Sequence, residues 1–236
     1  MYRVGVIGVG RIAAEFEDNH IKAYIGCKDT QIVTLCDTNI GKAYDCAERY
    51  GLKVDCVECI DDMPDVDIVS ICTRPELHHE NLFTCISRFN DLKAIYCEKP
   101  IATTIEEAED MIGLCKNQGV ILQINHQRRF GRPTASFARG MENTGTHMFD
   151  LLRMYFGDIK QIDNKSVITP DGITIDINEI QGGEHTFEFK VPPHEKGLIR
   201  LGVEHLVECI KEGKQSKSSG EDGLEALRLC QQFSQR

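Results

Sequence analysis

The sequence has no long apolar run, and no segment approaches the roughly 20 consecutive apolar residues that a membrane-spanning helix needs. This excludes an integral membrane protein. There is also no basic excess, because 27 Lys and Arg stand against 37 Asp and Glu, a net charge of −10. That balance argues against a surface built to bind a nucleic-acid backbone. With 41% hydrophobic and 27% charged residues, the chain is too apolar for global disorder and ordinary for a globular protein.

The first residues carry no basic stretch followed by an apolar core and a cleavage site, which predicts a cytoplasmic protein. The cysteines agree with this location: their number, 11, is odd, and several lie inside apolar runs. Cys56 and Cys59 form a close pair, but they lack the second pair or the histidines of a structural zinc site. We therefore predict packing roles for the cysteines and no metal site.

The first half of the chain alternates β-rich runs with amphipathic segments. The expected strands are dense in Val, Ile and Leu, as strands covered on both faces are, and lie at 3–7, 31–36, 66–72, 94–97 and 120–124. One helix is expected over 42–50, ending at Gly51, and another from the capping box of Thr104 and Glu107 to about Asn117, stopping near Gly119. The pattern predicts an α/β fold with a Rossmann-type, doubly wound parallel sheet in a first domain, residues 1–124.

Near Asn125 the character changes, which predicts a second, smaller α+β domain over residues 125–236, built on a mostly antiparallel sheet. Helices are expected at 146–156, 201–211 and 224–233, and strands at 167–177 and 185–191. We expect the last helix to pack back on the first domain. An open sheet with one uncovered face needs a partner, so a homo-oligomer, either a dimer or a tetramer, is also expected.

The pattern Gly8-Val-Gly10-Arg-Ile-Ala13 follows the first strand and is expected to open a helix. Gly8 permits a tight turn, Gly10 lets the backbone approach a pyrophosphate, and Ala13 allows close packing of helix on strand. Asp37, at the end of the second strand, can accept hydrogen bonds from both ribose hydroxyls and repel a 2′-phosphate. Its alternative role is to cap a turn or helix. Together these residues predict a dinucleotide site that favours NAD over NADP.

Four further segments follow in order: Thr73-Arg-Pro-Glu-Leu-His78-His79, then Glu98-Lys99-Pro100, then residues 125–130, and finally residues 145–152. With the glycine pattern, this order resembles the Gfo/Idh/MocA oxidoreductases, the glucose–fructose oxidoreductase and inositol dehydrogenase family. Residues 219–227 also resemble the closing helix of that family. The resemblance implies an NAD(P)-dependent oxidoreductase that transfers a hydride between nicotinamide and the hydroxyl or carbonyl group of a sugar, polyol or nucleotide-linked sugar.

By this resemblance Lys99 lies beside the nicotinamide and the substrate hydroxyl, and His147 faces the substrate, so the two would handle the proton. Judged by its chemistry alone, Lys99 would be a solvated loop lysine. Asn143 stands where the family often has an Asp, and an amide can orient a hydroxyl but cannot take a proton. The implied substrate residues are Lys99, Arg128, Asn143 and His147. The implied cofactor residues are Gly8, Gly10, Arg11, Ile12, Asp37, Thr73, His78, Glu98 and Lys99.

Several residues keep two interpretations. Arg128 and Arg129 either place positive charge near a sugar phosphate or pair with surface acids. Asp150 either orients the His147 ring or lies on a solvated helix face. Only surface or packing positions are expected for five histidines, His20, His126, His185, His194 and His205.

The segments between Phe130 and Asn143 and between 163 and 197 are short for the open antiparallel sheet of the family. With Asn143, this shortness supports an alternative function, a non-catalytic NAD-binding sensor or regulatory protein of the same fold. The intact Glu98-Lys99-Pro100 segment and His147 favour the enzyme. A third hypothesis is a reductase of a non-sugar carbonyl compound. None of the three needs a metal, a nucleic acid or a membrane.

Overall fold

The computed structural model describes residues 1–130, 149–150, 152–154, 157–159, 161–162, 166–168, 174–176 and 197–234. Its main sheet has six parallel strands in the order β3-β2-β1-β4-β5-β6. The strands are β1 (Tyr2–Ile7), β2 (Thr30–Cys36), β3 (Asp55–Val57), β4 (Ile68–Ile71), β5 (Ala94–Cys97) and β6 (Ile121–Ile124). The strand order reverses between β1 and β4. The carboxyl ends of these two strands therefore flank the position where doubly wound sheets bind their ligands.

The predicted parallel α/β sheet is confirmed, but the sequence indicated five strands rather than six. The strand it missed, β3, has only three residues and pairs with β2 at the edge of the sheet. Beyond β3, Cys59 is exposed and its thiol donates to Asp62 Oδ2 at 3.0 Å, so the packing role predicted for this cysteine is wrong. The cysteines inside the apolar runs, Cys36, Cys72, Cys97 and Cys115, are buried as predicted.

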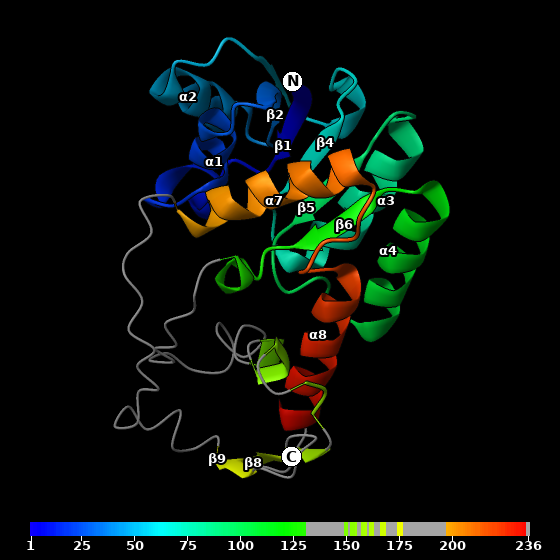
Figure 1. Cartoon of the computed structure of the whole chain (residues 1–236). Coiled ribbons are helices and arrows are strands. Elements are labelled where there is room, and N and C mark those ends of the chain that lie inside the picture. Colours follow the sequence, from blue (N-terminus) through cyan, green and yellow to red (C-terminus); the bar gives the residue numbers. More distant parts are fainter. Residues whose placement is uncertain are drawn as a thin grey trace.

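Helices cover both faces of the sheet (Figure 1). On one face pack α1 (His20–Gly26), α2 (Ile40–Tyr50) and α7 (Leu198–Glu212). On the other face pack α3 (His78–Arg88), α4 (Ile105–Gln118) and α8 (Gly220–Ser234). The first core is made largely of side chains such as Val4, Ile21, Ala43, Tyr96 and Val203, and the second of side chains such as Ile71, Leu82, Ile95, Met111 and Leu227. The strands read as continuous apolar runs because both of their faces are covered.

The helix ends follow the local sequence. α2 ends at Gly51, whose φ is +62°, and α4 ends at Gly119, whose φ is +67°, both in the left-handed region that glycine adopts at low cost. The predicted capping box is present: Thr104 Oγ1 accepts from the Glu107 N–H at 3.2 Å, and Glu107 Oε2 accepts from the Thr104 N–H at 3.1 Å.

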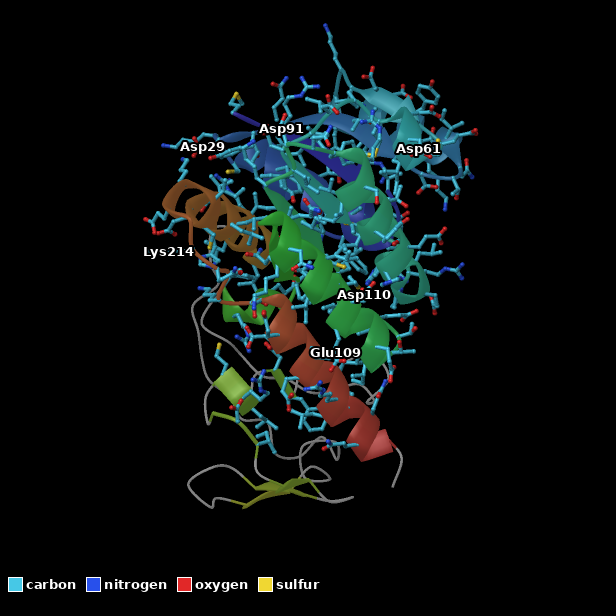
Figure 2. The ribbon with its side chains drawn as sticks, turned by 90° about the vertical axis from the view of Figure 1, so that its right-hand side faces the viewer. Asp29, Asp61, Asp91, Glu109, Asp110 and Lys214 are labelled. Carbon is cyan, nitrogen blue, oxygen red and sulfur yellow. The ribbon has the colours of Figure 1, made fainter. Side chains whose placement is uncertain are left out.

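Both terminal helices, rather than the last one alone, pack on the parallel sheet. Asp18 Oδ2 accepts from the Ile199 N–H at 3.1 Å and ties the start of α7 to the chain just before α1. Between the two helices, the Ile124 N–H donates to the Ser218 carbonyl at 2.8 Å, which attaches the connecting segment to the edge strand β6. α8 lies beside α4, where Arg228 pairs with Glu109 (Figure 2).

Three short antiparallel strands form a separate small sheet in the order β7 (Gln161–Ile162), β8 (Ser166–Ile168) and β9 (Thr174–Asp176). Residues 149–150 and 152–154 are helical. The rest of the expected second sheet, including the strand at 185–191, lies outside the described residues. Within the described ranges, no helix combines the length and apolar character needed to cross a bilayer.

Candidate active site

The glycine turn directly follows β1, at the reversal point of the strand order. Gly8 has a φ of +81°, and a side chain there would meet the backbone of Cys72 at 3.1 Å and Thr73 Cγ2 at 3.0 Å. Gly10 is extended, and a Cβ added to it would have no described atom within 4 Å. The turn therefore presents its backbone to open space at Gly10, where a pyrophosphate can approach closely.

The helix expected after this turn is interrupted. Residues Arg11–Glu15 form a single π-helical turn, and α1 begins only at His20, where the Asn19 side chain caps it by accepting from the Lys22 N–H at 2.9 Å. Ala13 is fully buried under the turn, as its small size predicts. The guanidinium of Arg11 lies 5.1 Å from the centre of the exposed Phe16 ring, and Ile12 packs against the first core. The interruption places His20 five residues past the end of the π turn and orients it toward the sheet.

Asp37 follows β2 and has the turn-capping role that was one of the two proposed for it. Its Oδ2 accepts from the Val9 N–H at 3.0 Å, and its Oδ1 accepts from the Asn39 N–H at 2.9 Å. These hydrogen bonds join the end of β2 to the glycine turn. A carboxylate has about four acceptor sites, so each oxygen keeps one for a ribose hydroxyl.

The segments after β4 and β5 are joined by His78, the first residue of α3. Its ring is fully buried, with Nδ1 2.9 Å from the Pro100 carbonyl oxygen and Nε2 3.1 Å from the Thr73 carbonyl oxygen. Thr73 is also held by Asn81, whose Nδ2 donates to Thr73 Oγ1 at 3.0 Å. Both ring nitrogens of His78 thus face backbone carbonyls, which supports a role in holding the Lys99–Pro100 turn against the end of β4.

Glu98 lies at the end of β5, immediately before Lys99, in a buried polar network. Its Oε1 accepts from Asn125 Nδ2 at 2.5 Å and lies 2.8 Å from His20 Nε2, while its Oε2 accepts from the Lys99 backbone N–H at 3.3 Å. Ser70 Oγ is 2.7 Å from His20 Nδ1, and the Tyr96 hydroxyl donates to Asn125 Oδ1 at 2.6 Å. The network fixes the backbone that carries Lys99.

His20 corrects the sequence analysis, which assigned it only a surface or packing position. Burial opposes its charge, but the adjacent Cys72 sulfur and the Glu98 carboxylate outweigh this effect and raise the pKa of His20 to about 10. Burial also opposes the charge of Glu98, and the hydrogen bonds from His20 and Asn125 outweigh it and hold the pKa of Glu98 below its usual value. The two side chains therefore form a buried ion pair at neutral pH, with 0% and 8% of their surfaces exposed.

A second charged cluster lies beyond β6 and also departs from expectation. Arg129 Nε donates to both oxygens of Asp150 at 2.8 Å, and its Nη1 lies 3.1 Å from Asp222 Oδ2. The Asp150 side chain is only 1% exposed, so the solvated helix face proposed for it is wrong. Arg129 pairs with acidic side chains, as one interpretation expected, but its side chain is only 9% exposed, so the pairing is not on the surface. Burial, reinforced by the charge of Arg129, lowers the pKa of the neighbouring His126 to about 3. This cluster joins the end of β6 to the helical residues 149–150 and to the start of α8.

Three predicted substrate residues remain untested. His147 and Asn143 lie outside the described residues. Arg128 belongs to the 3-10 turn Gln127–Arg129, but the structure does not describe its side chain. Of the proposed proton-handling pair, Lys99 alone is placed, at the carboxyl edge of the sheet after β5. The part of the chain that the structure describes contains no group of three His, Cys, Asp or Glu side chains that could hold a metal ion.

Comparisons with known proteins agree with this geometry. The chain is 36% identical over 131 residues to the 1,5-anhydro-D-fructose reductase of Ensifer adhaerens, covering 55% of this chain and 37% of that protein. It is 33% identical over 129 residues to the inositol 2-dehydrogenase of Rhizobium meliloti, covering 54% of this chain and 37% of that protein. The chain thus spans little more than a third of the length of these curated relatives.

Among solved structures, the aldose-aldose oxidoreductase of Caulobacter crescentus complexed with glycerol matches with a TM-score of 0.75 at 19% identity, covering 99% of this chain and 96% of that one. The WlbA dehydrogenase of Bordetella pertussis, in complex with NADH and UDP-GlcNAcA, matches with a TM-score of 0.71 at 18% identity, covering 99% and 95%. At these identities the likeness shows the fold. The family model that describes an oxidoreductase family with an NAD-binding Rossmann fold matches residues 2–126. The chain therefore belongs to the Gfo/Idh/MocA oxidoreductase family, and its first half is the NAD-binding Rossmann fold of that family.

Proposed function

We propose that the protein is an NAD-dependent dehydrogenase that interconverts a hydroxyl and a carbonyl group on a sugar, polyol or nucleotide-linked sugar. One observation carries this proposal: Lys99 is held by the buried Glu98 network at the same sheet edge as the open backbone of Gly10. The names of the relatives support the substrate class, because they are reductases and dehydrogenases of an anhydro sugar and of inositol. The family assignment argues against the non-catalytic alternative.

The residues around the glycine turn fit NAD. Gly8 and Gly10 would bring the backbone of the turn, with Arg11 and Ile12, against the pyrophosphate. Asp37, already held by two backbone N–H groups, would accept from the ribose hydroxyls, and its negative charge would disfavour the 2′-phosphate of NADP. Thr73 and Glu98, at the ends of β4 and β5, would line the nicotinamide side, and His78 would keep these ends in place.

The cofactor, when bound, supplies the chemistry of hydride transfer. The protein must then hold the substrate carbon in position and move one proton to or from the substrate oxygen. Lys99 Nζ and the His147 ring would exchange that proton, one as the base and the other as its hydrogen-bonding partner. Asn143 would orient a substrate hydroxyl, and Arg128 would contact the substrate or its phosphate.

The remaining organisation follows from the same proposal. Residues 1–124 would form the cofactor domain, and residues 125–236 would contribute a smaller α+β unit with a mostly antiparallel sheet, of which β7–β9 are a part. Its open sheet face would be covered by a second copy of the chain, in a dimer or a tetramer. We expect this assembly in the cytoplasm.

Turnover on a panel of polyols, sugars and UDP-sugars, with NAD or NADH, tests the proposal. Lys99→Ala should keep NAD affinity within about threefold and lower kcat by at least about 100-fold, as loss of a general base does. Lys116→Ala, an exposed lysine on α4, is the matched control and should keep full activity. Activity of Lys99→Ala near that of the control would refute the assignment of Lys99. NAD binding without turnover on the whole panel would favour a sensor.

A further inference from the structure

His20 provides a positive charge behind the proposed active site. It is the first residue of α1, and it is fully buried. Its Nε2 lies 2.8 Å from Oε1 of Glu98, which is 78 positions further along the chain. The other ring nitrogen lies 2.7 Å from Ser70 Oγ in β4. One histidine thus bridges the ends of β4 and β5, under the backbone that carries Lys99.

We propose that His20 is a positioning residue for the reaction. Its positive charge balances the negative charge of Glu98, so that the Glu98 carboxylate can fix the Lys99 backbone without holding the Lys99 amine in its protonated, charged form. The inference rests on the proposed function in so far as Lys99 is the base of that reaction. Glu98 and Lys99 are neighbours in the chain, and a carboxylate beside an amine favours the protonated amine. A base must be able to lose that proton near working pH.

The contacts of Glu98 separate its two oxygens by role. Oε1 accepts a hydrogen bond from Asn125 Nδ2 and contacts His20 Nε2. The side-chain oxygen of Asn125, Oδ1, is held in turn by the Tyr96 hydroxyl. Oε2 receives the Lys99 backbone N–H. The carboxylate is therefore oriented at both oxygens, and the positive charge of His20 balances its negative charge at Oε1.

The charge of His20 is supported by its surroundings. Six titratable groups lie in or around the network. They are Tyr24 in α1, Cys72 directly after β4, Tyr96 in β5, Glu98 and Lys99 directly after β5, and His126 beyond β6. Burial raises the pKa of Tyr96 and Tyr24, so both phenols stay neutral. Burial and Arg129 lower the pKa of His126 to about 3, so this ring is neutral at pH 7 as well. Cys72 and Glu98 are then the groups that raise the pKa of His20.

The interrupted helical segment after the glycine turn brings His20 into contact with Glu98. The π turn Arg11–Glu15 ends before Phe16. The chain becomes helical again at His20, directly after Asn19, which caps α1 and is itself fully buried. Asn19 Nδ2 also donates to the Phe16 carbonyl at 2.6 Å. The same segment that forms the cofactor turn thus also delivers His20 to Glu98.

The test compares full-length His20→Gln, Glu98→Gln and the double variant. His20→Gln removes the positive charge that balances Glu98, so Lys99 should lose its proton at higher pH. The acidic limb of the profile of kcat against pH should therefore move to higher pH. At neutral pH, kcat should fall about tenfold for each pH unit of this displacement. Glu98→Gln leaves His20 uncompensated and should move the same limb to lower pH. The double variant should return it toward the wild-type position. A role in packing alone would lower kcat equally at every pH, and that result would overturn the proposal.

A second measurement is independent of turnover. In protein labelled with ¹³C at lysine, the Lys99 signal, assigned by its loss in Lys99→Arg, should titrate at higher pH in His20→Gln than in wild type. His79→Gln is the matched control, since His79 pairs with Asp110 on the surface at 2.7 Å and should leave this titration unchanged. An unchanged Lys99 titration in His20→Gln would overturn the inference even in an active enzyme. If the Lys99 titration is displaced in His20→Gln but the wild-type protein shows no turnover, the proposed reaction is refuted and the inference about His20 stands. Should His20→Gln fail to fold, Glu98→Gln with the opposite displacement decides the question.

Discussion

The glycine turn allows backbone strain, steric contact and cofactor approach to be separated with three single substitutions. Gly51→Ala changes a residue with φ of +62° and no described atom within 4 Å of the added Cβ, so it measures the left-handed backbone alone. That conformation costs roughly 1–2 kcal/mol for a residue with a Cβ. Gly8→Ala imposes the same backbone cost at a φ of +81° and adds a steric contact.

The contact at Gly8 has little room to relax. The new Cβ would lie 3.1 Å from the carbonyl carbon and oxygen of Cys72, and Cys72 is held because its N–H donates to the Ile7 carbonyl at 2.8 Å. Overpacking of this kind costs about 1–3 kcal/mol. Gly8→Ala should therefore destabilise the protein by about 2–5 kcal/mol, more than Gly51→Ala, in urea unfolding followed by circular dichroism. Equal losses in the two variants would show that the contact with Cys72 is not rigid.

Gly10→Ala should give the reverse result. Its φ of −76° suits alanine and its Cβ would meet no described atom within 4 Å, so stability should stay within about 0.5 kcal/mol of wild type. The methyl group would occupy the space that the pyrophosphate needs, and the Kd for NAD from calorimetric titration should rise at least about tenfold, or 1.4 kcal/mol. A folded Gly10→Ala protein that binds NAD like wild type would refute the placement of the pyrophosphate at this turn.

Three further predictions concern Asp37, Thr104 and His20. Asp37→Ala should lower the ratio of NADP to NAD dissociation constants, since the carboxylate facing the ribose is lost; a wild-type preference for NADP would contradict this argument. Thr104→Ala removes one half of a capping box and should lower the free energy of unfolding by about 1 kcal/mol, whereas the same change at Thr38, outside any capping box, should not. Because the pKa of His20 rises from 6.5 to about 10 on folding, its stabilising contribution is complete below pH 6.5 and is lost as pH rises through about 10. Wild type should therefore lose a few kcal/mol more than His20→Gln over that range, on the order of 1.4 kcal/mol per pKa unit, in denaturant series at several pH values.

The parts of the fold that were predictable are those decided by local chemistry. The capping box of Thr104 and the left-handed glycines at 51 and 119 act within one helical turn, and the structure has them where the sequence indicated. Buried parallel strands are recognisable because both faces are apolar. β3 was not predicted because three residues at a sheet edge are too few to show a strand pattern. Its Cys56 is also half of the close cysteine pair, a pattern that is typical of metal sites as well.

The candidate site was predictable only in so far as its residues lie in contiguous motifs. The glycine turn, Asp37 and the Glu98-Lys99-Pro100 segment are each recognisable from a few consecutive residues and the strand before them. His20 belongs to the site only through a contact with Glu98 that spans 78 positions of the chain, whereas Asn125, which reaches Glu98 across 27 positions, begins the recognisable segment 125–130. The break between Arg11–Glu15 and α1 decides where His20 points, whereas the glycine pattern predicted only that a helix opens after the turn. The only sequence signal for that break is the helix-capping Asn19 directly before His20.

The placement of the charged pair supports a role beyond stability. Removing two charges from water costs several kcal/mol per ion, and well-packed apolar side chains of similar volume often serve stability as well or better. The surrounding core follows that rule, since Tyr24, Ile71, Ile95 and Tyr96 are fully buried with neutral side chains. The ion pair of His20 and Glu98 instead lies where β4 and β5 end, one residue before the lysine that the proposed reaction needs. Hydrogen bonds with Ser70 and Asn125 hold this buried charge pair in place, and Tyr96 holds Asn125. Its position at that edge is explained if the function of the pair is to control the electrostatic charge next to Lys99.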